Sequence, residues 1–289
     1  MIVQESTETK FPKLEELFPL RGRSAGKDVV DFKAVRKHIR DVNLITQEPT
    51  SREGLPDLSG PPEGNDPLPE PDGYVDRGSL YSFAQNLNAS DASAVLDSVL
   101  FAQAVADLEH ENKKNTQEWY DEYVHWLSVQ GWVTQNFSWK DLNDSTSELV
   151  MQDAILEVII SAVGSGAVYN LMLSLFQILV NKQDTPEFTL LENKKNAKSG
   201  GGFQIGAADY SGGGAEQVVC PSMFTAYQTE ETHHNFLWWS WTSSSINFYG
   251  AFNNLVLNKD AWNQVKDEVI EKLGELRTQQ IGSVGPLKA

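Results

Sequence analysis

The sequence predicts an α+β fold in which helices come first, an antiparallel β-sheet of about five strands packs with them, and a further helix closes the chain. Apolar residues recur at spacings of three and four over residues 90–130 and 149–180, which is typical of helices. From residue 186 to residue 257, apolar and polar residues tend to alternate, as they do along strands. The connections between these strands are short, so we expect neighbouring strands to be antiparallel.

Residues 1–75 differ from the rest of the chain. A short amphipathic helix is expected from Val29 to Ile39, and the segment from Thr46 to Gly73 is then rich in proline and glycine. Proline fixes φ and lacks a backbone donor, so this segment should be irregular. We therefore expect an irregular, proline-rich N-terminal arm with a short helix at residues 1–75. A single α+β domain should occupy residues 76–289, with a helical first half, a sheet-rich second half and a closing helix.

Two helices are expected at the start of this domain. Ser90 or Asp91 can cap the first helix, which ends in the polar run from residue 109 to residue 114. The second helix ends at residues 130–131 and places three aromatic side chains on one face, namely Trp119, Tyr123 and Trp126. A strand at residues 132–137 follows.

The longest apolar region runs from Leu149 to Val180 and consists of two blocks, Ala154 to Val163 and Ala167 to Val180. Each block is shorter than the roughly 20 apolar residues that a bilayer requires. We expect two buried core helices and no transmembrane span. The alternative is a helical hairpin that inserts into a membrane after a conformational change, as in pore-forming toxins.

The second half should contain strands at residues 188–191, 203–210, 217–228, 236–242 and 246–257. Asn258 can then cap the closing helix. Apolar residues step by three and four along this helix and should pack on one face of the sheet: Trp262, Val265, Val269, Leu273 and Leu276.

Charge restricts the partners. Aspartate and glutamate total 40 against 23 lysines and arginines, a formal net charge of −17, which repels phosphate backbones. Nucleic acid is therefore not an expected partner. The first residues do not resemble a secretory signal, so we expect synthesis in the cytoplasm. Secretion by a route that needs no signal peptide, or association with a membrane, stays open, and the sequence does not indicate an oligomeric state.

Cys220 is the only cysteine in the chain. A single thiol excludes a disulfide framework and a site built from several cysteines. The histidines lack the spacing of a metal site, and the two triple-glycine segments lack the Walker pattern, so we predict neither a metal nor a nucleotide. The thiol is left as an inert core residue, an attachment point or a nucleophile.

The strand that carries Cys220 suggests what could surround the thiol. Val218, Cys220 and Phe224 share one strand face, and a hairpin with the strand at 236–242 would place Cys220 opposite Trp241. His233 would then be too distant to act as a base, although His125 or His38 could approach through folding. A fatty acid joined to Cys220 as a thioester could lie in an apolar cavity formed by Val218, Phe224, Trp238, Trp239, Trp241, Phe248 and Phe252.

The chain resembles the Erwinia virulence factor Evf family in three features. These are the lone cysteine in Val218-Val219-Cys220-Pro221, the acidic chain without a signal, and the order of helices and strands over residues 90–281. That family consists of bacterial α/β proteins that carry a palmitate on a buried cysteine. The resemblance implies a lipoprotein of virulence or host interaction, with palmitate on Cys220 and a fatty acyl chain or membrane lipid as partner. Two alternatives stay open: a pore-forming or membrane-perturbing toxin that uses residues 149–180, and a cysteine-dependent hydrolase or acyltransferase.

Overall fold

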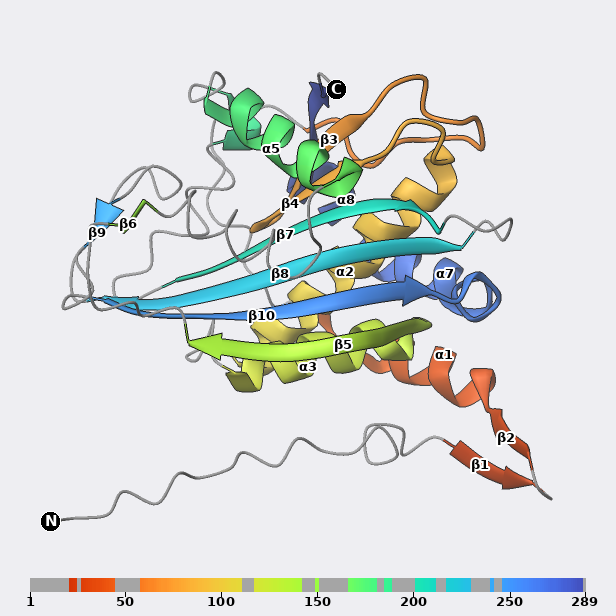
Figure 1. Ribbon diagram of the computed structural model, residues 1–289. Helices are drawn as coiled ribbons and strands as arrows, with labels where there is room; N and C mark the ends of the chain where they lie inside the picture. Colours follow the sequence, from red (N-terminus) through yellow and green to blue (C-terminus); the bar gives the residue numbers. More distant parts are fainter. Residues whose placement is uncertain are drawn as a thin grey trace, which may run out of the picture.

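The computed structural model (Figure 1) describes residues 21–24, 27–44, 58–110, 117–141, 149–150, 166–180, 185–188, 201–211, 217–229, 240–241 and 246–287. Over these residues the fold is α+β, as the sequence predicts. The helices are α1 (Phe32–Asp41), α2 (Ala89–Glu109), α3 (Gln117–Val129), α5 (Ala167–Val180), α7 (Lys259–Leu273) and α8 (Leu276–Gln280). The main strands are β3 (Asp72–Asp76), β4 (Ser79–Phe83), β5 (Trp132–Asp141), β7 (Gly201–Tyr210), β8 (Val218–Thr229), β10 (Ile246–Leu257) and β11 (Ile281–Pro286).

These strands form one sheet in the order β11-β3-β4-β7-β8-β10-β5. The prediction of about five antiparallel strands is wrong in two details, because the sheet has seven strands and β4 pairs with β7 in parallel. The chain between β4 and β7 includes α2, α3 and α5, and only a long connection of this kind can join parallel neighbours. Three strands of this sheet, β3, β4 and β11, are not among the predicted ones. β3 and β4 are buried on both faces, so their sequences do not alternate between apolar and polar residues.

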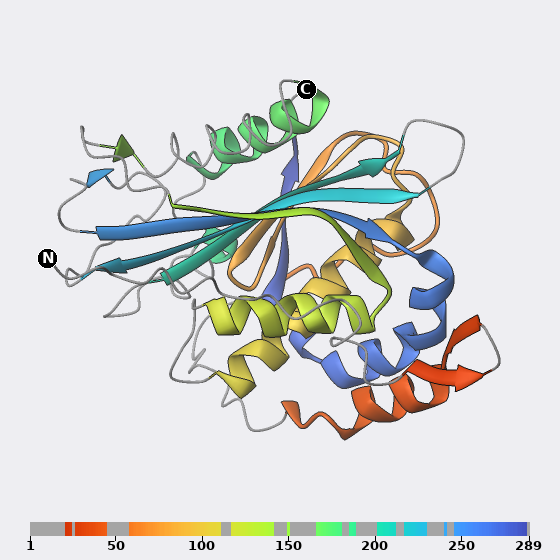
Figure 2. The same cartoon turned by 60° about the horizontal axis from the view of Figure 1, so that its bottom comes forward.

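Helices cover both faces of the sheet. Figure 2 shows α1, α2, α3 and α7 on one side and α5 on the other, and α5 contacts β4 and β7. We call these the helix-layer face and the α5 face. The main core cluster lies on the helix-layer face and includes residues of α2, α3 and α7. No helix among the described residues is long and apolar enough to cross a membrane.

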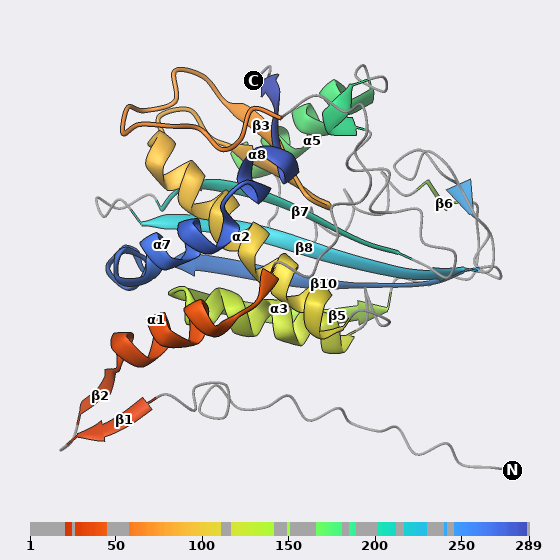
Figure 3. The ribbon, with the colours of Figure 1, turned by 180° about the vertical axis from the view of Figure 1, so that it is seen from behind.

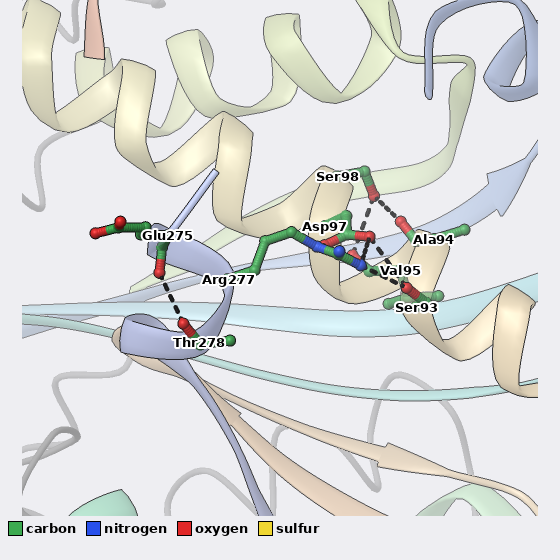
Figure 4. A network of polar contacts seen from close by, with 8 residues as sticks. All are labelled: Ser93, Ala94, Val95, Asp97, Ser98, Glu275, Arg277 and Thr278. Carbon is green, nitrogen blue, oxygen red and sulfur yellow. Dashed lines mark hydrogen bonds and ion pairs between the residues drawn. The ribbon is translucent and has the colours of Figure 1, made fainter. Parts of the chain in front are cut away.

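Helix α2 is buried along nearly its whole length. An ion pair joins it to the end of the chain, because Arg277 Nε lies 2.7 Å from Asp97 Oδ1 and Arg277 Nη2 lies 3.0 Å from Asp97 Oδ2. Figure 4 shows this contact with Ser93, whose hydroxyl donates to the same carboxylate. Burial raises the pKa of Asp97, although the bonds from Arg277 oppose the shift. The C-terminal helix α8 is therefore held against the buried helix α2 by this ion pair.

The N-terminal part of the chain joins the same body in two places. The expected short helix is present as α1, and it lies on the outside of α7 (Figure 3), with Arg36 and Arg40 pairing with Glu268. Before it, β1 (Arg21–Ser24) and β2 (Lys27–Val30) form a separate hairpin. The predicted boundary after residue 75 falls inside β3, and the buried side chains of Leu58 and Leu68 belong to the segment before it.

Several local predictions differ from the structure. Asn88 is the N-cap residue of α2 in place of Ser90 or Asp91, although its side chain makes no capping hydrogen bond. The Asp91 carboxylate accepts hydrogen bonds from Lys259 and Tyr210. Phe188, expected to begin a strand, ends a short helical turn. The apolar block at 154–163 and the residues at 189–191 lie outside the described part of the chain.

The closing helix α7 begins after its predicted cap, since Asn258 Oδ1 accepts a hydrogen bond from the Ala261 backbone nitrogen. Its predicted stripe is buried at Trp262, Val265, Val269 and Leu273, whereas Leu276 belongs to α8 and is partly buried. The stripe contacts α2 and α1 in place of the sheet face, because α2 is buried around nearly its whole circumference and lies between the sheet and α7.

Candidate functional site

Cys220 lies near the start of β8, in the middle of the sheet. Its register partner is Leu255 of β10, and β7 pairs with the other edge of β8. The predicted hairpin with the strand at 236–242 is wrong: β9 (Ser240–Trp241) pairs with β6 (Leu149–Val150) in a separate small sheet. Both edges of β8 are already occupied by β7 and β10, so no edge is left for β9.

The predicted cavity residues are divided between the two faces of the sheet. Val218, Cys220 and Phe224 alternate onto the helix-layer face and belong to its core cluster. Phe252 is paired with Met223, which has the opposite parity in β8, so Phe252 lies on the α5 face. Phe252 therefore does not share a cavity with Cys220.

The other predicted cavity residues are less fully described. Trp238 and Trp239 lie outside the described residues. Trp241 is in β9 and Phe248 is in β10, where the structure describes their backbone. Their predicted contact with an acyl chain stays a prediction.

A glycine on the neighbouring strand makes room beside the thiol. A Cβ atom at Gly206 would stand 3.2 Å from Cys220 Sγ and 2.4 Å from Cε1 of Tyr81. The Tyr81 ring thus occupies the space over Gly206, and the thiol borders the same space, so β4, β7 and β8 meet at this point. Neither Tyr81 nor Gly206 is marked by any sequence pattern that we could read.

Hydroxyl and amide groups gather at the tip of the Tyr81 ring. Tyr81 Oη lies 3.5 Å from Tyr123 Oη of α3 and donates to Gln204 Oε1 at 3.4 Å, and Ser79 Oγ donates to the same oxygen at 3.5 Å. All of these side chains are buried. Gln204 Nε2 has no hydrogen-bond partner among the described residues. The group contains polar donors that are weakly engaged or not engaged at all.

Aromatic rings form the wall next to this group. The ring of Phe224 stacks between those of Tyr120 and Trp119, with centroid separations of 4.7 and 5.4 Å. Trp119 also stacks on Tyr123 at 5.6 Å. Asn253 of β10 donates to the Tyr120 hydroxyl and so fixes this end of α3 on the sheet. The three aromatic residues that the sequence places on one helix face therefore do lie in the core.

Burial controls the chemistry of the thiol. Cys220 is 1% exposed, and desolvation raises its pKa to about 12. No cation among the residues that the structure describes offsets this shift. Burial also raises the pKa of Tyr81 and Tyr123 well above its usual value, with the nearby Cys220 adding to both shifts. The thiol and both hydroxyls therefore keep their protons at neutral pH.

The histidines that could have served the thiol lie against another residue. His38 of α1 stacks on the Trp126 ring at a centroid distance of 4.7 Å, and His125 meets the same ring edge-on at 5.9 Å. His233 and His234 are outside the described residues. Among the residues that the structure describes, no base accompanies the buried, protonated thiol.

Sequence reasoning missed a second buried polar group beside this site. Both oxygens of the Asp76 carboxyl lack partners among the described residues, although the carboxyl is fully buried. Its neighbour Arg77 bonds to Asp107 through Nε and Nη2 at 3.0 and 2.5 Å. A charged pair followed by glycine in a tight turn is usually exposed, so no pattern in the sequence predicts that these side chains are buried.

Comparisons with known proteins add a fold likeness. No protein-family model matches the chain, and no curated protein matches it. A solved structure described as "Structure of the Evf virulence factor" resembles it with 12% sequence identity and a TM-score of 0.28, covering 73% of this chain and 85% of that one. The weak resemblance stated from the sequence is thus found again in the structure. At this similarity the function has to be argued from the site itself.

Proposed function

We propose that the protein carries a long acyl chain, such as palmitate, as a thioester on Cys220, and that it acts as a lipid-bearing virulence or host-interaction protein. The supporting observation is the position of the only thiol of the chain, which is buried on the helix-layer face among aromatic side chains. A thioester there would be neutral and shielded from water. The acyl chain would extend along an apolar interior at little electrostatic cost.

The high pKa of the thiol favours an anchor over a catalyst. A nucleophilic cysteine needs a thiolate, which a pKa of about 12 makes scarce at neutral pH. This observation counts against a cysteine-dependent hydrolase or acyltransferase. It does not count against a thioester, because the acyl sulfur carries no proton and no charge.

Loading of the chain requires a state in which the thiol is exposed. In that state the Cys220 sulfur would attack the carbonyl carbon of an acyl thioester donor. The bond between this carbon and Sγ would form, and its bond to the donor sulfur would break. The donor would leave as a thiol that takes the cysteine proton. An incompletely folded chain, in which α2 and α3 do not yet cover the sheet, would provide such a state. The donor is expected to be of the acyl-thioester class.

An acyl chain buried in the core also has consequences for membrane association. A chain held inside the protein would not anchor it, so membrane association would require the chain to leave the core. We propose that the protein is made in the cytoplasm and reaches a host or a membrane by a route that needs no signal peptide. The pore-forming alternative would use residues 149–180, and within this region α5 packs against β4 and β7.

Intact-mass measurement tests the proposal directly. Protein purified from its producing bacterium should be heavier than its sequence by one acyl group, and neutral hydroxylamine should remove this excess because it cleaves thioesters. The Cys220→Ser variant, produced in the same way, should show the sequence mass before and after treatment. A wild-type mass equal to the sequence mass would sink the proposal.

A further inference from the structure

The polar groups around Tyr81 are hydrogen-bond donors with weak or missing acceptors, which a ligand could supply. The two tyrosine hydroxyls and the Gln204 amide supply several hydrogen-bond donors. The distance from Tyr81 Oη is 3.5 Å to Tyr123 Oη and 3.4 Å to Gln204 Oε1, whereas a good O–H···O hydrogen bond is about 2.7–2.8 Å long. Gln204 is 4% exposed, and its Nε2 donor has no partner among the described residues. Leaving such a donor unpaired in the interior is costly.

An oxygen that only accepts hydrogen bonds would complement this group. The two tyrosine hydroxyls are 3.5 Å apart, so one oxygen atom can lie about 2.8 Å from each of them. High pKa values keep both hydroxyls protonated and able to donate. Gln204 lies on the same sheet face, paired with Ser79 of β4, and shares its oxygen with Tyr81.

The thiol lies near the edge of the Tyr81 ring, on the side of Cε1, the ring carbon next to the one that bears the hydroxyl. Tyr81 and Cys220 Sγ both come within 3.2 Å of the point where a Cβ at Gly206 would stand, so the tyrosine ring and the sulfur share one space. The carbonyl oxygen of a thioester is two bonds from the sulfur. It is therefore the acceptor that the position of Cys220 would deliver to the tyrosine hydroxyls.

We propose that Tyr81, Tyr123 and Gln204 form a binding site for the carbonyl oxygen of an acyl group, whether the acyl group is a thioester on Cys220 or a fatty acid bound without a covalent bond. The site deepens the proposed function and rests on it. The two hydroxyls would donate to the oxygen, with Tyr81 giving up its long contact to Gln204 Oε1, and Gln204 Nε2 would supply a third donor. The site would fix the head of the acyl chain and leave its tail to the aromatic wall around Phe224.

Infrared spectroscopy of a labelled carbonyl tests this site. Bacteria producing the protein would be fed palmitate with a ¹³C carbonyl, and the labelled band would be compared between wild type, Tyr81→Phe and Tyr123→Phe. Loss of a donor should shift the band to higher frequency in both variants. Tyr74→Phe is the matched control, because Tyr74 is another buried tyrosine of the same face, paired with Tyr81 across β3 and β4 but directed to Asp72 and Ser283. Its band should equal that of wild type.

A further variant, Gln204→Met, removes the amide while keeping the length of the side chain and should also shift the band. Mass before and after hydroxylamine, and after solvent extraction of the unfolded protein, separates a thioester from a bound fatty acid. An acyl group whose band is unchanged in the variants, or changed equally in Tyr74→Phe, would overturn the site and leave the proposed function intact. Absence of any acyl group would overturn both.

Discussion

Two buried aspartates of the core differ in whether their carboxyl groups have partners. Arg77 and Asp107 pair with each other in the interior, whereas Asp76 next to them has no partner among the described residues for either carboxylate oxygen. Burial raises the pKa of Asp76 well above its usual value, the charge of Asp97 adds to this, and Arg77 opposes it. The folded protein therefore holds Asp76 as a neutral acid under conditions in which the unfolded chain ionises it.

The sign of the resulting pH dependence follows from linkage. Because the pKa of Asp76 is higher in the folded state, its contribution to stability is complete below about pH 4 and is lost as the pH rises through the folded-state pKa. Asp76→Asn replaces the neutral acid by an uncharged side chain of the same shape. It should raise the free energy of unfolding at about pH 7 and change it little at about pH 4, as measured by urea denaturation.

Asp107→Asn is the control with the opposite expected sign. It leaves Arg77 buried with a weakened partner, so it should lower the free energy of unfolding at neutral pH by about 3 kcal/mol or more. If Asp76→Asn also destabilises the protein at neutral pH, the carboxyl is ionised in the folded state and the assignment made above is wrong.

At the scale of elements, the site depends on which strands are neighbours. Hydrophobic spacing predicts α3, β8, β10 and α7 with nearly their observed bounds, because each has one regular buried face. It does not reveal that β4 lies parallel to β7, which is what brings Tyr81 beside Gly206 and Cys220. That pairing connects residues 125 positions apart, as Ser79 and Gln204 are, and no pattern in either segment identifies its partner. The sequence therefore points to the cysteine but not to the hydroxyls around it.

The two faces of the sheet offer a matched pair of substitutions. Phe224→Ala removes the ring that stacks on Trp119 and Tyr120, and Phe252→Ala removes a ring of the same size from the α5 face. Each should cost about 3–5 kcal/mol of stability. Only Phe224→Ala should speed hydrogen exchange in α3 and lower the acyl content of the purified protein.

Hydrogen exchange followed by mass spectrometry over residues 117–129, together with intact mass, measures both effects. A loss of acyl content in Phe252→Ala as large as that in Phe224→Ala would mean that the chain does not lie on the helix-layer face. Equal exchange of α3 in the two variants would show that Phe224 does not hold that helix on the sheet.

At the scale of the whole molecule, the seven-stranded sheet carries α1, α2, α3 and α7 on one face and α5 on the other, and the proposed acyl chain would lie between the sheet and the larger helix layer. The side chains already fill the core around Cys220, so an acyl chain would take space from them and become part of the packing. Burial of each methylene is worth about 0.8 kcal/mol, and the 14 or so methylenes of a palmitoyl group would together contribute on the order of 10 kcal/mol. This is comparable with the roughly 5–15 kcal/mol that stabilises a typical folded domain.

Removal of the chain should therefore lower the thermal stability of the entire domain. Acylated protein treated with neutral hydroxylamine and freed of released fatty acid should melt at a clearly lower temperature than the same protein treated with buffer, and the two should separate in a calorimetric scan. The Cys220→Ser protein, which has no thioester to lose, should melt at the same temperature with either treatment. A mass loss in the wild type with an unchanged melting temperature would place the chain outside the core, where it could reach a membrane directly without any opening of the helix layer.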